Sequence, residues 1–233
     1  MDLKAHRDES TGRWTLEGVE PSEVTFERMC KMLLEGENFK FARYGDGEFL
    51  CMAGKIGKNC DGHEYFPDLG MALNDAFYSD PKYMVGIQPL SVNGGLYQKA
   101  ISQREGYPKN IYDADVLHSA SIDGKMHLFF DSIKKRDVFM VGPKHLFPFF
   151  SHGIIIKDSN CWNDYKSITE GLQNMLSKIQ GNVMLMCASM MTEVLINDLQ
   201  NSNNTIIDCG SVFDPYVNKL SRSYHHKLKL NGH

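Results

Sequence analysis

Short apolar runs that alternate with longer segments of helical periodicity restrict the fold of this chain most strongly. Runs of three to five residues at 39–42, 83–87, 138–141, 153–156, 183–187 and 205–207 predict strands. The runs are apolar throughout rather than alternating, which is typical of strands that are buried on both faces. The sequence therefore predicts an α/β, Rossmann-like fold, with a mainly parallel sheet and helices on both faces.

The helices expected between these strands follow from apolar spacing and from start and stop residues. In the segment 22–36, Phe26, Met29, Cys30, Leu33 and Leu34 recur at helical intervals before Gly36. Segment 88–95 is rich in Pro, Asn and Gly and is expected to be a loop. Further helices are predicted at 48–52, 68–78, 96–104, 123–134, 165–179 and 190–199.

Length and composition indicate one globular domain. The chain has 233 residues, of which 42% are hydrophobic and 23% charged. We expect a polar N-terminal arm at 1–21 and a single α/β domain at 22–233, because no repeat or linker interrupts the pattern.

No targeting or membrane-spanning segment is expected. The first residues lack the apolar core of a signal peptide, and no apolar run reaches the length of a membrane span. The six cysteines include no CxxC pair. A cytoplasmic, reducing location is the prediction, and the oligomeric state is left open.

The segment 43–48, with the sequence RYGDGE, carries the chemistry that stands out most. It follows a predicted strand and places two carboxylates, Asp46 and Glu48, beside Gly45, Gly47 and the preceding Arg43. Mg²⁺ in proteins is typically held by one or two carboxylates together with substrate phosphates. The segment is therefore a candidate metal–diphosphate site, although Gly-Asp-Gly is also common turn chemistry.

The RYGDGE segment resembles the RxGDGE signature of the GT-D glycosyltransferases, which use nucleotide sugars. Two weaker blocks extend the resemblance, VGPKH at 141–145 and the segment 183–214. The resemblance implies that Asp46 and Glu48 bind Mn²⁺ or Mg²⁺, which holds the diphosphate of a UDP-linked donor. It also implies a glycan or glycoprotein hydroxyl as acceptor. We expect Arg43, Gly45 and Gly47 to contact the donor. Arg43 would orient the carboxylates or a phosphate, or pair with Asp46 as a buried structural ion pair.

Three further positions are predicted to bind the donor from turns that follow strands. Lys144 comes after a strand and a Gly-Pro turn, where a cation could meet a phosphate. Asn93 lies in an Asn-Gly-Gly turn, and Ser189 lies among small residues that permit close approach of a ligand. Each of these has a purely structural alternative: a surface lysine, a plain turn, or tight helix packing.

The C-terminal region supplies candidates for the base and for further donor contacts. Asp214 and Asp208 are the two carboxylates expected to accept the proton of the acceptor hydroxyl, with Asp214 preferred. His225 is expected to contact the diphosphate or the acceptor.

Charge leaves the identity of the acceptor open. The net charge is −4, which argues against nonspecific binding of nucleic acid. A basic cluster near the C-terminus nevertheless allows a second acceptor, a hydroxymethylated DNA base. Two other classes are kept as alternatives: a non-catalytic nucleotide-binding protein and a metal-dependent phosphohydrolase. The basic cluster consists of Lys219, Arg222, Lys227 and Lys229.

Overall fold

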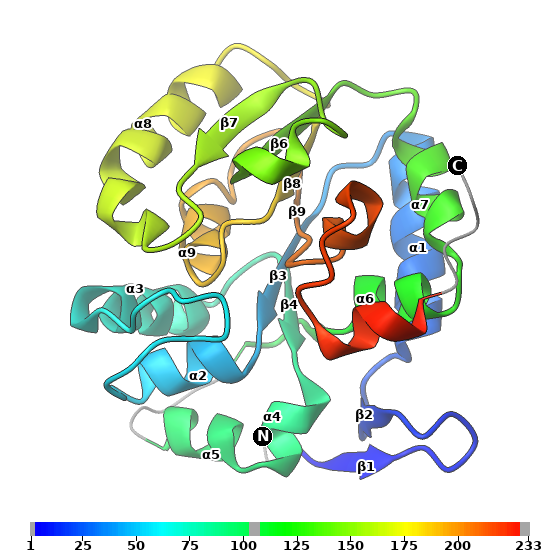
Figure 1. Ribbon diagram of the computed structural model, residues 1–233, viewed down its shortest axis with the longest axis vertical. Helices are drawn as coiled ribbons and strands as arrows, with labels where there is room; N and C mark the ends of the chain where they lie inside the picture. The colour runs from blue at the N-terminus through cyan, green and yellow to red at the C-terminus, as the bar shows by residue number, and fades with distance from the viewer. Residues whose placement is uncertain (1–2, 103–107, 229–233) are drawn as a thin grey trace.

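A seven-stranded parallel sheet forms the centre of the molecule in the computed structural model, which describes residues 3–102 and 108–228. The strand order is β5-β4-β3-β9-β8-β6-β7, and every neighbouring pair is parallel (Figure 1). This confirms the predicted fold class. The strands are β3 (Lys40–Tyr44), β4 (Met84–Ile87), β5 (Ile111–Asp113), β6 (Val138–Pro143), β7 (Gly153–Ile156), β8 (Val183–Met186) and β9 (Thr205–Asp208).

Helices cover both faces of the sheet and create two separate hydrophobic cores. One face is covered by α1 (Ser22–Glu35), α6 (Val116–Ile122) and α7 (Met126–Ile133). The other face is covered by α2 (Asp46–Met52), α3 (Pro67–Tyr78), α4 (Pro89–Asn93), α5 (Leu96–Ile101), α8 (Tyr165–Leu176) and α9 (Met191–Asp198). Strands β4, β8 and β9 are buried along their whole length, as their continuous apolar sequences require.

Helix α1 illustrates how the apolar spacing positions a helix. Phe26, Met29 and Leu33 are almost fully buried against the sheet. Leu34 does not follow them, because its position turns away from this face and leaves the side chain 58% exposed. Gly36 ends the helix in the left-handed conformation, with φ of 77°, which glycine adopts without the Cβ clash of other residues.

Several elements differ from the sequence prediction. The expected loop at 88–95 contains the short helix α4, which begins at Pro89, a residue suited to the first helical position. Helix α2 begins at Asp46, two residues earlier than predicted, so the two carboxylates lie in the first turn of a helix. Strand β5 and helix α6 were not predicted, and α7 covers only part of the expected helix at 123–134.

The N-terminal arm contains an ordered antiparallel hairpin, formed by β1 (Ala5–Arg7) and β2 (Trp14–Leu16). Leu3 and Leu16 are 2% and 4% exposed and join the core on the α2–α3 side of the sheet. The hairpin packs against α4, beside the N-terminus in Figure 1. Burial of these leucines fixes the arm to the domain.

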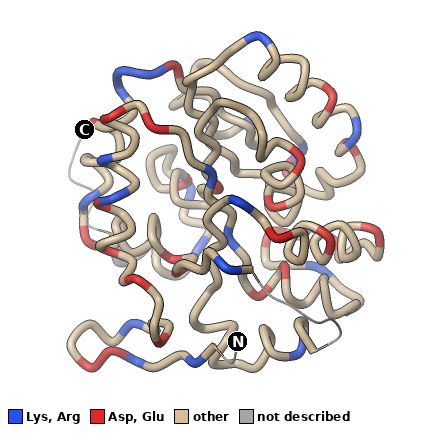
Figure 2. The backbone as a smooth tube through the Cα atoms, turned by 180° about the vertical axis from the view of Figure 1, so that it is seen from behind, with Lys and Arg blue, Asp and Glu red and all other residues tan. Residues whose placement is uncertain are grey.

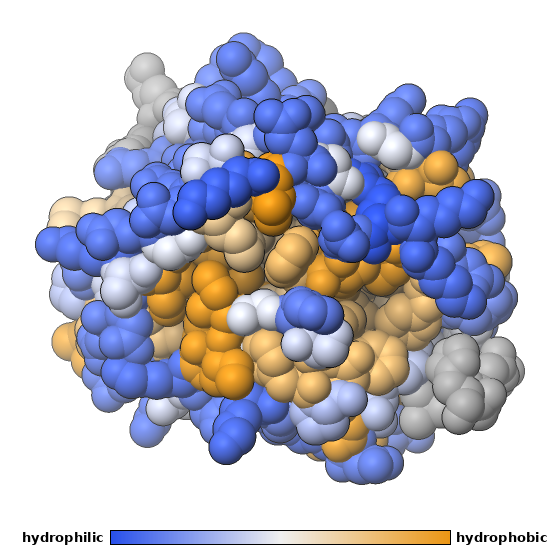
Figure 3. All heavy atoms as spheres, turned by 90° about the horizontal axis from the view of Figure 1, so that it is seen from above, coloured by the Kyte–Doolittle hydropathy of each residue, from blue (hydrophilic) through white to orange (hydrophobic). Residues whose placement is uncertain are grey.

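The surface carries charges of both signs. Figure 2 shows Lys and Arg interspersed with Asp and Glu along the backbone. In the view of Figure 3, hydrophobic side chains reach the surface in the middle of one face, and hydrophilic side chains surround them.

Within the described ranges, no helix has the length and apolar character needed to cross a bilayer. The six cysteines are all free thiols.

Candidate functional site

A cleft of about 530 Å³ opens at the carboxyl ends of β3, β4 and β9. Strands β3 and β9 are neighbours in the middle of the sheet. The chain that follows β3 packs on one face of the sheet, through α2, and the chain that follows β9 packs on the opposite face, through Val212 and Phe213. Such a reversal leaves a crevice between two adjacent strand ends, and ligands of open α/β sheets bind in this place.

The first turn of α2 presents Asp46 and Glu48 to the cleft. Glu48 Oε2 accepts a hydrogen bond of 2.8 Å from the backbone N–H of Gly45, which holds the carboxylate against the turn. Asp46 is exposed. Burial, together with the charges of Asp208 and Asp46, raises the pKa of Glu48 to about 7. The cleft therefore concentrates negative charge at this turn.

Glu193 and Asp208 form a second carboxyl pair beneath the same cleft. Glu193 lies in the first turn of α9 and is 1% exposed, and Asp208 ends β9 and is 4% exposed. Burial and the nearby Glu48 and Asp208 carboxylates raise the pKa of Glu193 well above its ordinary value. The hydrogen bond between Glu193 and Asp208 raises the pKa of Glu193 further, so Glu193 is the donor and Asp208 the acceptor. Asp208 also accepts a bond of 2.9 Å from the Gly210 N–H.

Arg43 is the penultimate residue of β3, and its guanidinium contacts the chain that follows β5. Its Nε donates to the Ala114 carbonyl oxygen at 2.7 Å, and an Nη donates to His118 Nδ1 at 2.9 Å. Asp115 is 3.7 Å from the same nitrogen. Burial lowers the pKa of Arg43, but the Asp208 and Asp115 carboxylates outweigh it and raise the pKa. Of the two roles considered for Arg43, the ion pair with Asp46 is not the arrangement observed.

The four carboxyl groups of the cleft, Asp46, Glu48, Glu193 and Asp208, offer oxygen ligands for a divalent cation. Among the residues that the structure describes, no three His, Cys, Asp or Glu side chains are grouped closely enough to enclose a cation. Glu193 Oε2 nevertheless has no hydrogen-bond partner in the same described residues, although it is buried. Oxygen donors with excess negative charge are the chemistry that Mg²⁺ and Mn²⁺ prefer, and Mg²⁺ needs only one or two protein carboxylates when phosphates complete its shell.

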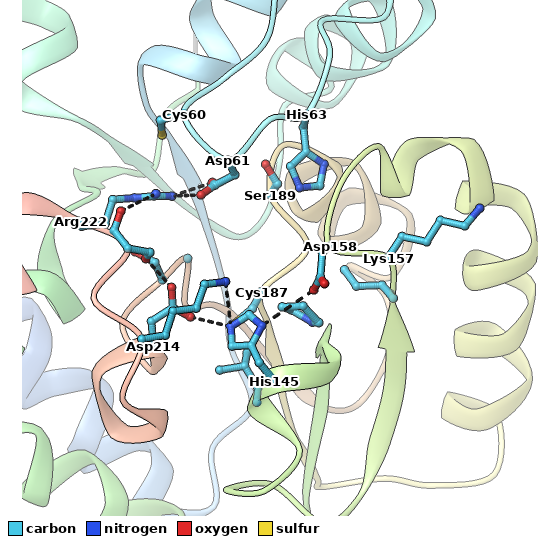
Figure 4. A pocket seen from close by; sticks show the side chains of 17 residues that line it. Cys60, Asp61, His63, His145, Lys157, Asp158, Cys187, Ser189, Asp214 and Arg222 are labelled. Atoms are coloured by element: carbon cyan, nitrogen blue, oxygen red, sulfur yellow. Dashed lines mark hydrogen bonds and ion pairs between the residues drawn. The ribbon is translucent and has the colours of Figure 1, made fainter.

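The cleft continues into a second cavity of about 300 Å³ at the carboxyl ends of β6, β7 and β8. The two cavities share six lining residues, which mark the junction: Cys60, Asp61, Ser189, Gly210, Ser211 and Arg222. Ser189 adopts φ of 51°, and its Oγ accepts a bond of 2.8 Å from Asn59 Nδ2. Arg222 Nη2 lies 2.6 Å from both carboxylate oxygens of Asp61, and this ion pair also borders the junction (Figure 4).

A histidine–aspartate pair dominates the second cavity. His145 Nε2 donates to Asp214 Oδ1 at 2.9 Å, and Asp214 is 6% exposed. Asp214 Oδ2 accepts a hydrogen bond from the Ser221 hydroxyl, so both carboxylate oxygens are engaged. His145 Nδ1 lies 3.8 Å from Asp158 Oδ1, and Lys219 Nζ is 3.3 Å from His145 Nε2. Figure 4 shows the imidazole at the centre of this group.

The other three residues that were expected to bind the sugar donor do not line either cavity. Lys144 is exposed, begins a three-residue 3₁₀ turn rather than a longer helix, and lines neither cavity. Asn93 is exposed at the end of α4. His225 is 3% exposed and lines neither cavity, and its Nδ1 accepts a bond of 3.2 Å from the Arg222 N–H. Their donor-binding roles stay predictions without a supporting contact.

The basic C-terminal cluster is divided by the fold. Arg222 is engaged with Asp61, and Lys219 lines the second cavity. Lys227 ends the 3₁₀ helix η4 (Ser223–Lys227), and Lys229 lies outside the described residues.

Sequence reasoning missed several residues that line the cavities. Glu193 has the clearest signal, because it is the one acid in an otherwise apolar stretch that starts a helix. His145 belongs to the VGPKH block, but the neighbouring Lys144 was preferred to it. Trp14 and His118 gave no signal, since their neighbours in space are distant in sequence.

Comparisons of the whole structure with solved structures identify proteins of the same shape. The chain superimposes on a domain of unknown function 1792 (DUF1792) with a TM-score of 0.61 and 16% identity, covering 82% of this chain and 78% of the other. The chain has the fold of the DUF1792 glycosyltransferases. A glycosyltransferase (DUF1792) from Streptococcus sanguinis matches with a TM-score of 0.58 and 17% identity, over 82% of this chain and 81% of that one.

A third solved structure supports the same fold. A DUF1792 domain described as having a distinct glycosyltransferase fold matches with a TM-score of 0.60 and 18% identity, over 82% of this chain and 78% of that one. The fold that the resemblance to GT-D glycosyltransferases implied is thus confirmed. No model of a known protein family matches the sequence, and no curated protein matches it.

Proposed function

We propose that this protein is a metal-dependent glycosyltransferase. It would move a sugar from a nucleotide-diphosphate sugar, with UDP as the leading nucleotide, to a hydroxyl group of a glycan or glycoprotein. One observation carries the proposal: four carboxyl groups gather at the switch point of a sheet whose fold is that of the DUF1792 glycosyltransferases. These groups are Asp46, Glu48, Glu193 and Asp208.

The residues present fit a divalent cation next to a diphosphate. Asp46 and Glu48 would hold Mn²⁺ or Mg²⁺, and the bound ion would act as a Lewis acid that offsets the charge developing on the departing diphosphate. Glu193 and Asp208 support these two residues from beneath. Because the pKa of Glu193 is raised and Glu193 donates a hydrogen bond to Asp208, this pair adds less negative charge than two free carboxylates would.

The second cavity suits the acceptor. Its cationic side chains are largely neutralised, as Arg222 pairs with Asp61 and Lys157 lies 2.9 Å from Asp164. A polar cavity with balanced charge favours a neutral polyhydroxyl compound over a polyanion. The glycan acceptor is therefore preferred to the hydroxymethylated DNA base, whose binding would need unpaired cations along the phosphates.

We assign the proton-accepting role to His145. The acceptor oxygen would attack the anomeric carbon as the bond from that carbon to the diphosphate oxygen breaks, and the leaving nucleoside diphosphate keeps the bonding electrons. The hydroxyl proton would pass to His145 Nδ1, because Asp214 already binds the hydrogen on Nε2. Asp214 then acts as a positioning residue rather than as the base, since both of its oxygens are engaged. Asp208 is engaged with Glu193 and Gly210.

Release of the free nucleotide tests the proposal. The protein is incubated with UDP-, GDP- and dTDP-linked sugars and Mn²⁺, with and without a panel of oligosaccharide acceptors, and the nucleoside diphosphate is measured. Acceptor-stimulated release supports a glycosyltransferase. Binding without release would indicate a nucleotide-binding protein. Release of inorganic phosphate or of sugar phosphate would indicate a phosphohydrolase.

Salt dependence separates the two acceptor classes. Affinity for a neutral glycan should change little between 50 and 200 mM salt. A DNA acceptor would instead show a steep loss of affinity, because binding releases one counterion for each phosphate neutralised.

A further inference from the structure

The N-terminal hairpin forms one wall of the larger cleft. Gly12, Arg13 and Trp14 line the cleft together with the carboxylates of the sheet edge. Arg13 anchors the hairpin through a bidentate ion pair with Asp123, with distances of 2.9 and 2.6 Å. Together with the buried Leu16, this ion pair fixes the turn between β1 and β2 against the rest of the domain. The hairpin is therefore a fixed wall of the cleft.

Trp14 offers a flat apolar surface to the cleft. Its side chain is half-buried, and among the described residues no aromatic ring stacks on the indole. Leu90 of α4 and Ile122 of α6 line the same end of the cleft. Leu90 is 53% exposed. A half-buried indole that lines a cleft beside aliphatic side chains is a typical platform for a planar ring.

The order of the carboxylates and the hairpin along the cleft indicates which planar ring would lie on the Trp14 indole. Gly47 is close to Asn59, which donates a hydrogen bond to Ser189 at the junction with the second cavity. Asp208 lies two residues from Gly210, which also lines the junction. The carboxylates and the hairpin residues line the larger cleft and not the second cavity, but the contacts just described place the carboxylates next to the junction. A diphosphate held at the carboxylates would have its sugar at the junction and its nucleoside at the hairpin.

We infer that Trp14 stacks on the nucleobase of the donor and that the hairpin is the nucleoside-binding wall of the site. This inference rests on the proposed function. The stacking of a base on an aromatic side chain tolerates different bases, because each base has a π face. Trp14 would therefore hold the nucleoside without choosing the base.

The chain provides a matched optical test, because it contains two tryptophans. Trp162 stacks on Tyr165 at 4.5 Å and lines neither the larger cleft nor the second cavity. In a Trp162→Phe variant, the emission reports on Trp14 alone. In the Trp14→Phe variant, the emission reports on Trp162. Each variant is titrated with UDP, GDP and dTDP in the presence of Mn²⁺, and with inorganic diphosphate, which has no base. Calorimetry measures binding in parallel.

We expect a nucleotide that binds by calorimetry to quench the emission of the Trp162→Phe protein with the same Kd, and to leave the emission of Trp14→Phe unchanged. A Trp14→Ala variant should bind this nucleotide about 5- to 150-fold more weakly, which corresponds to the loss of one base stack. Its affinity for inorganic diphosphate should stay the same, which also shows that the variant is folded.

Two results would overturn the inference, and they differ in what they say of the donor site. If a nucleotide binds by calorimetry but neither the Trp14 emission nor the Trp14→Ala affinity changes, the hairpin does not hold the base and the glycosyltransferase proposal stands. If neither the nucleotides nor inorganic diphosphate bind to the unmodified protein, the proposed function fails and the inference fails with it.

Discussion

The imidazole of His145 is tied to the carboxylate of Asp214 by a hydrogen bond of 2.9 Å, although the two residues are 69 positions apart in the chain. The bond fixes which imidazole nitrogen carries the hydrogen and leaves Nδ1 of this cavity-lining residue as the nitrogen that can accept a proton. The same pairing of an oriented imidazole with a buried carboxylate serves general-base catalysis in other enzymes.

Replacement of His145 by Ala should therefore lower kcat without changing donor binding. A lost general base typically costs about 10²- to 10⁴-fold in rate. The measurement is kcat for acceptor-dependent nucleotide release, with the donor Kd from calorimetry. His152→Ala, at an exposed histidine just before β7, is the matched control and should keep the full rate. An unchanged kcat in His145→Ala would return the role of base to a carboxylate.

Asp46→Asn and Glu48→Gln should each remove Mn²⁺-dependent donor binding while the protein stays folded. The fold should survive because burial makes the ionised Glu48 carboxylate unfavourable, as its raised pKa shows, and the amide removes that charge. Calorimetry of UDP binding with and without Mn²⁺ checks this. Asp68→Asn is the control, since Asp68 is exposed in the first turn of α3 and lines neither cavity. Normal Mn²⁺ dependence in both site variants would contradict the metal assignment.

Gly210→Ala should destabilise the protein and disturb Arg43. Gly210 has φ of 52°, and an added Cβ would lie 2.3 Å from a guanidinium nitrogen of Arg43. The left-handed conformation costs an alanine about 1–2 kcal/mol, and the overpacking adds about 1–3 kcal/mol. At about 2–4 °C per kcal/mol, a clear fall in Tm follows.

The control for this glycine is Gly171→Ala. Gly171 is exposed within α8, and an added Cβ would meet no atom within 4 Å. Alanine should therefore stabilise α8 by about 0.5–1 kcal/mol, because it is the better helix former. Equal Tm values for the two variants would mean that neither the left-handed backbone at position 210 nor the contact of the added Cβ with Arg43 destabilises the protein.

His118 should make the protein less stable as the pH falls. Burial, and then the positive charge of Arg43, lower the pKa of His118 to about 4, from an ordinary value of 6.5. Between these pH values the unfolded chain binds a proton that the native protein does not. Stability is therefore lost as the pH falls from 6.5 towards 4, by at most about 1.4 kcal/mol per pH unit.

The contribution of His118 is isolated by difference, because nearby carboxyl groups with raised pKa values act in the opposite direction. Denaturant unfolding of the wild-type protein and of His118→Gln is compared at intervals between pH 7 and 4. The variant should lose less stability over this range. The same change at exposed His127 is the control. Parallel pH profiles for wild type and His118→Gln would show that His118 titrates normally.

Local sequence determined the layers of the fold and the two carboxylates of the proposed metal site. Continuous apolar runs such as those at 183–187 and 205–207 bury all their side chains only when both faces of the strand are covered. A parallel sheet with helices on both faces follows from this requirement. Asp46 and Glu48 are two positions apart after a strand, so their proximity needs no knowledge of the rest of the chain. Short elements were missed where polar residues interrupt the apolar pattern, as Asp113 does at the end of β5.

Only the tertiary structure decided which distant residues complete the site. The order of the strands places β9 beside β3, which brings Asp208 and the adjoining Glu193 under the α2 carboxylates. The hydrogen bond between Asn59 and Ser189 joins residues 130 positions apart. The hairpin brings Trp14 to the cleft through the packing of Leu3 and Leu16. Strand order and hairpin docking depend on packing between whole elements, and the periodicity of a single segment carries no information about its neighbours in space.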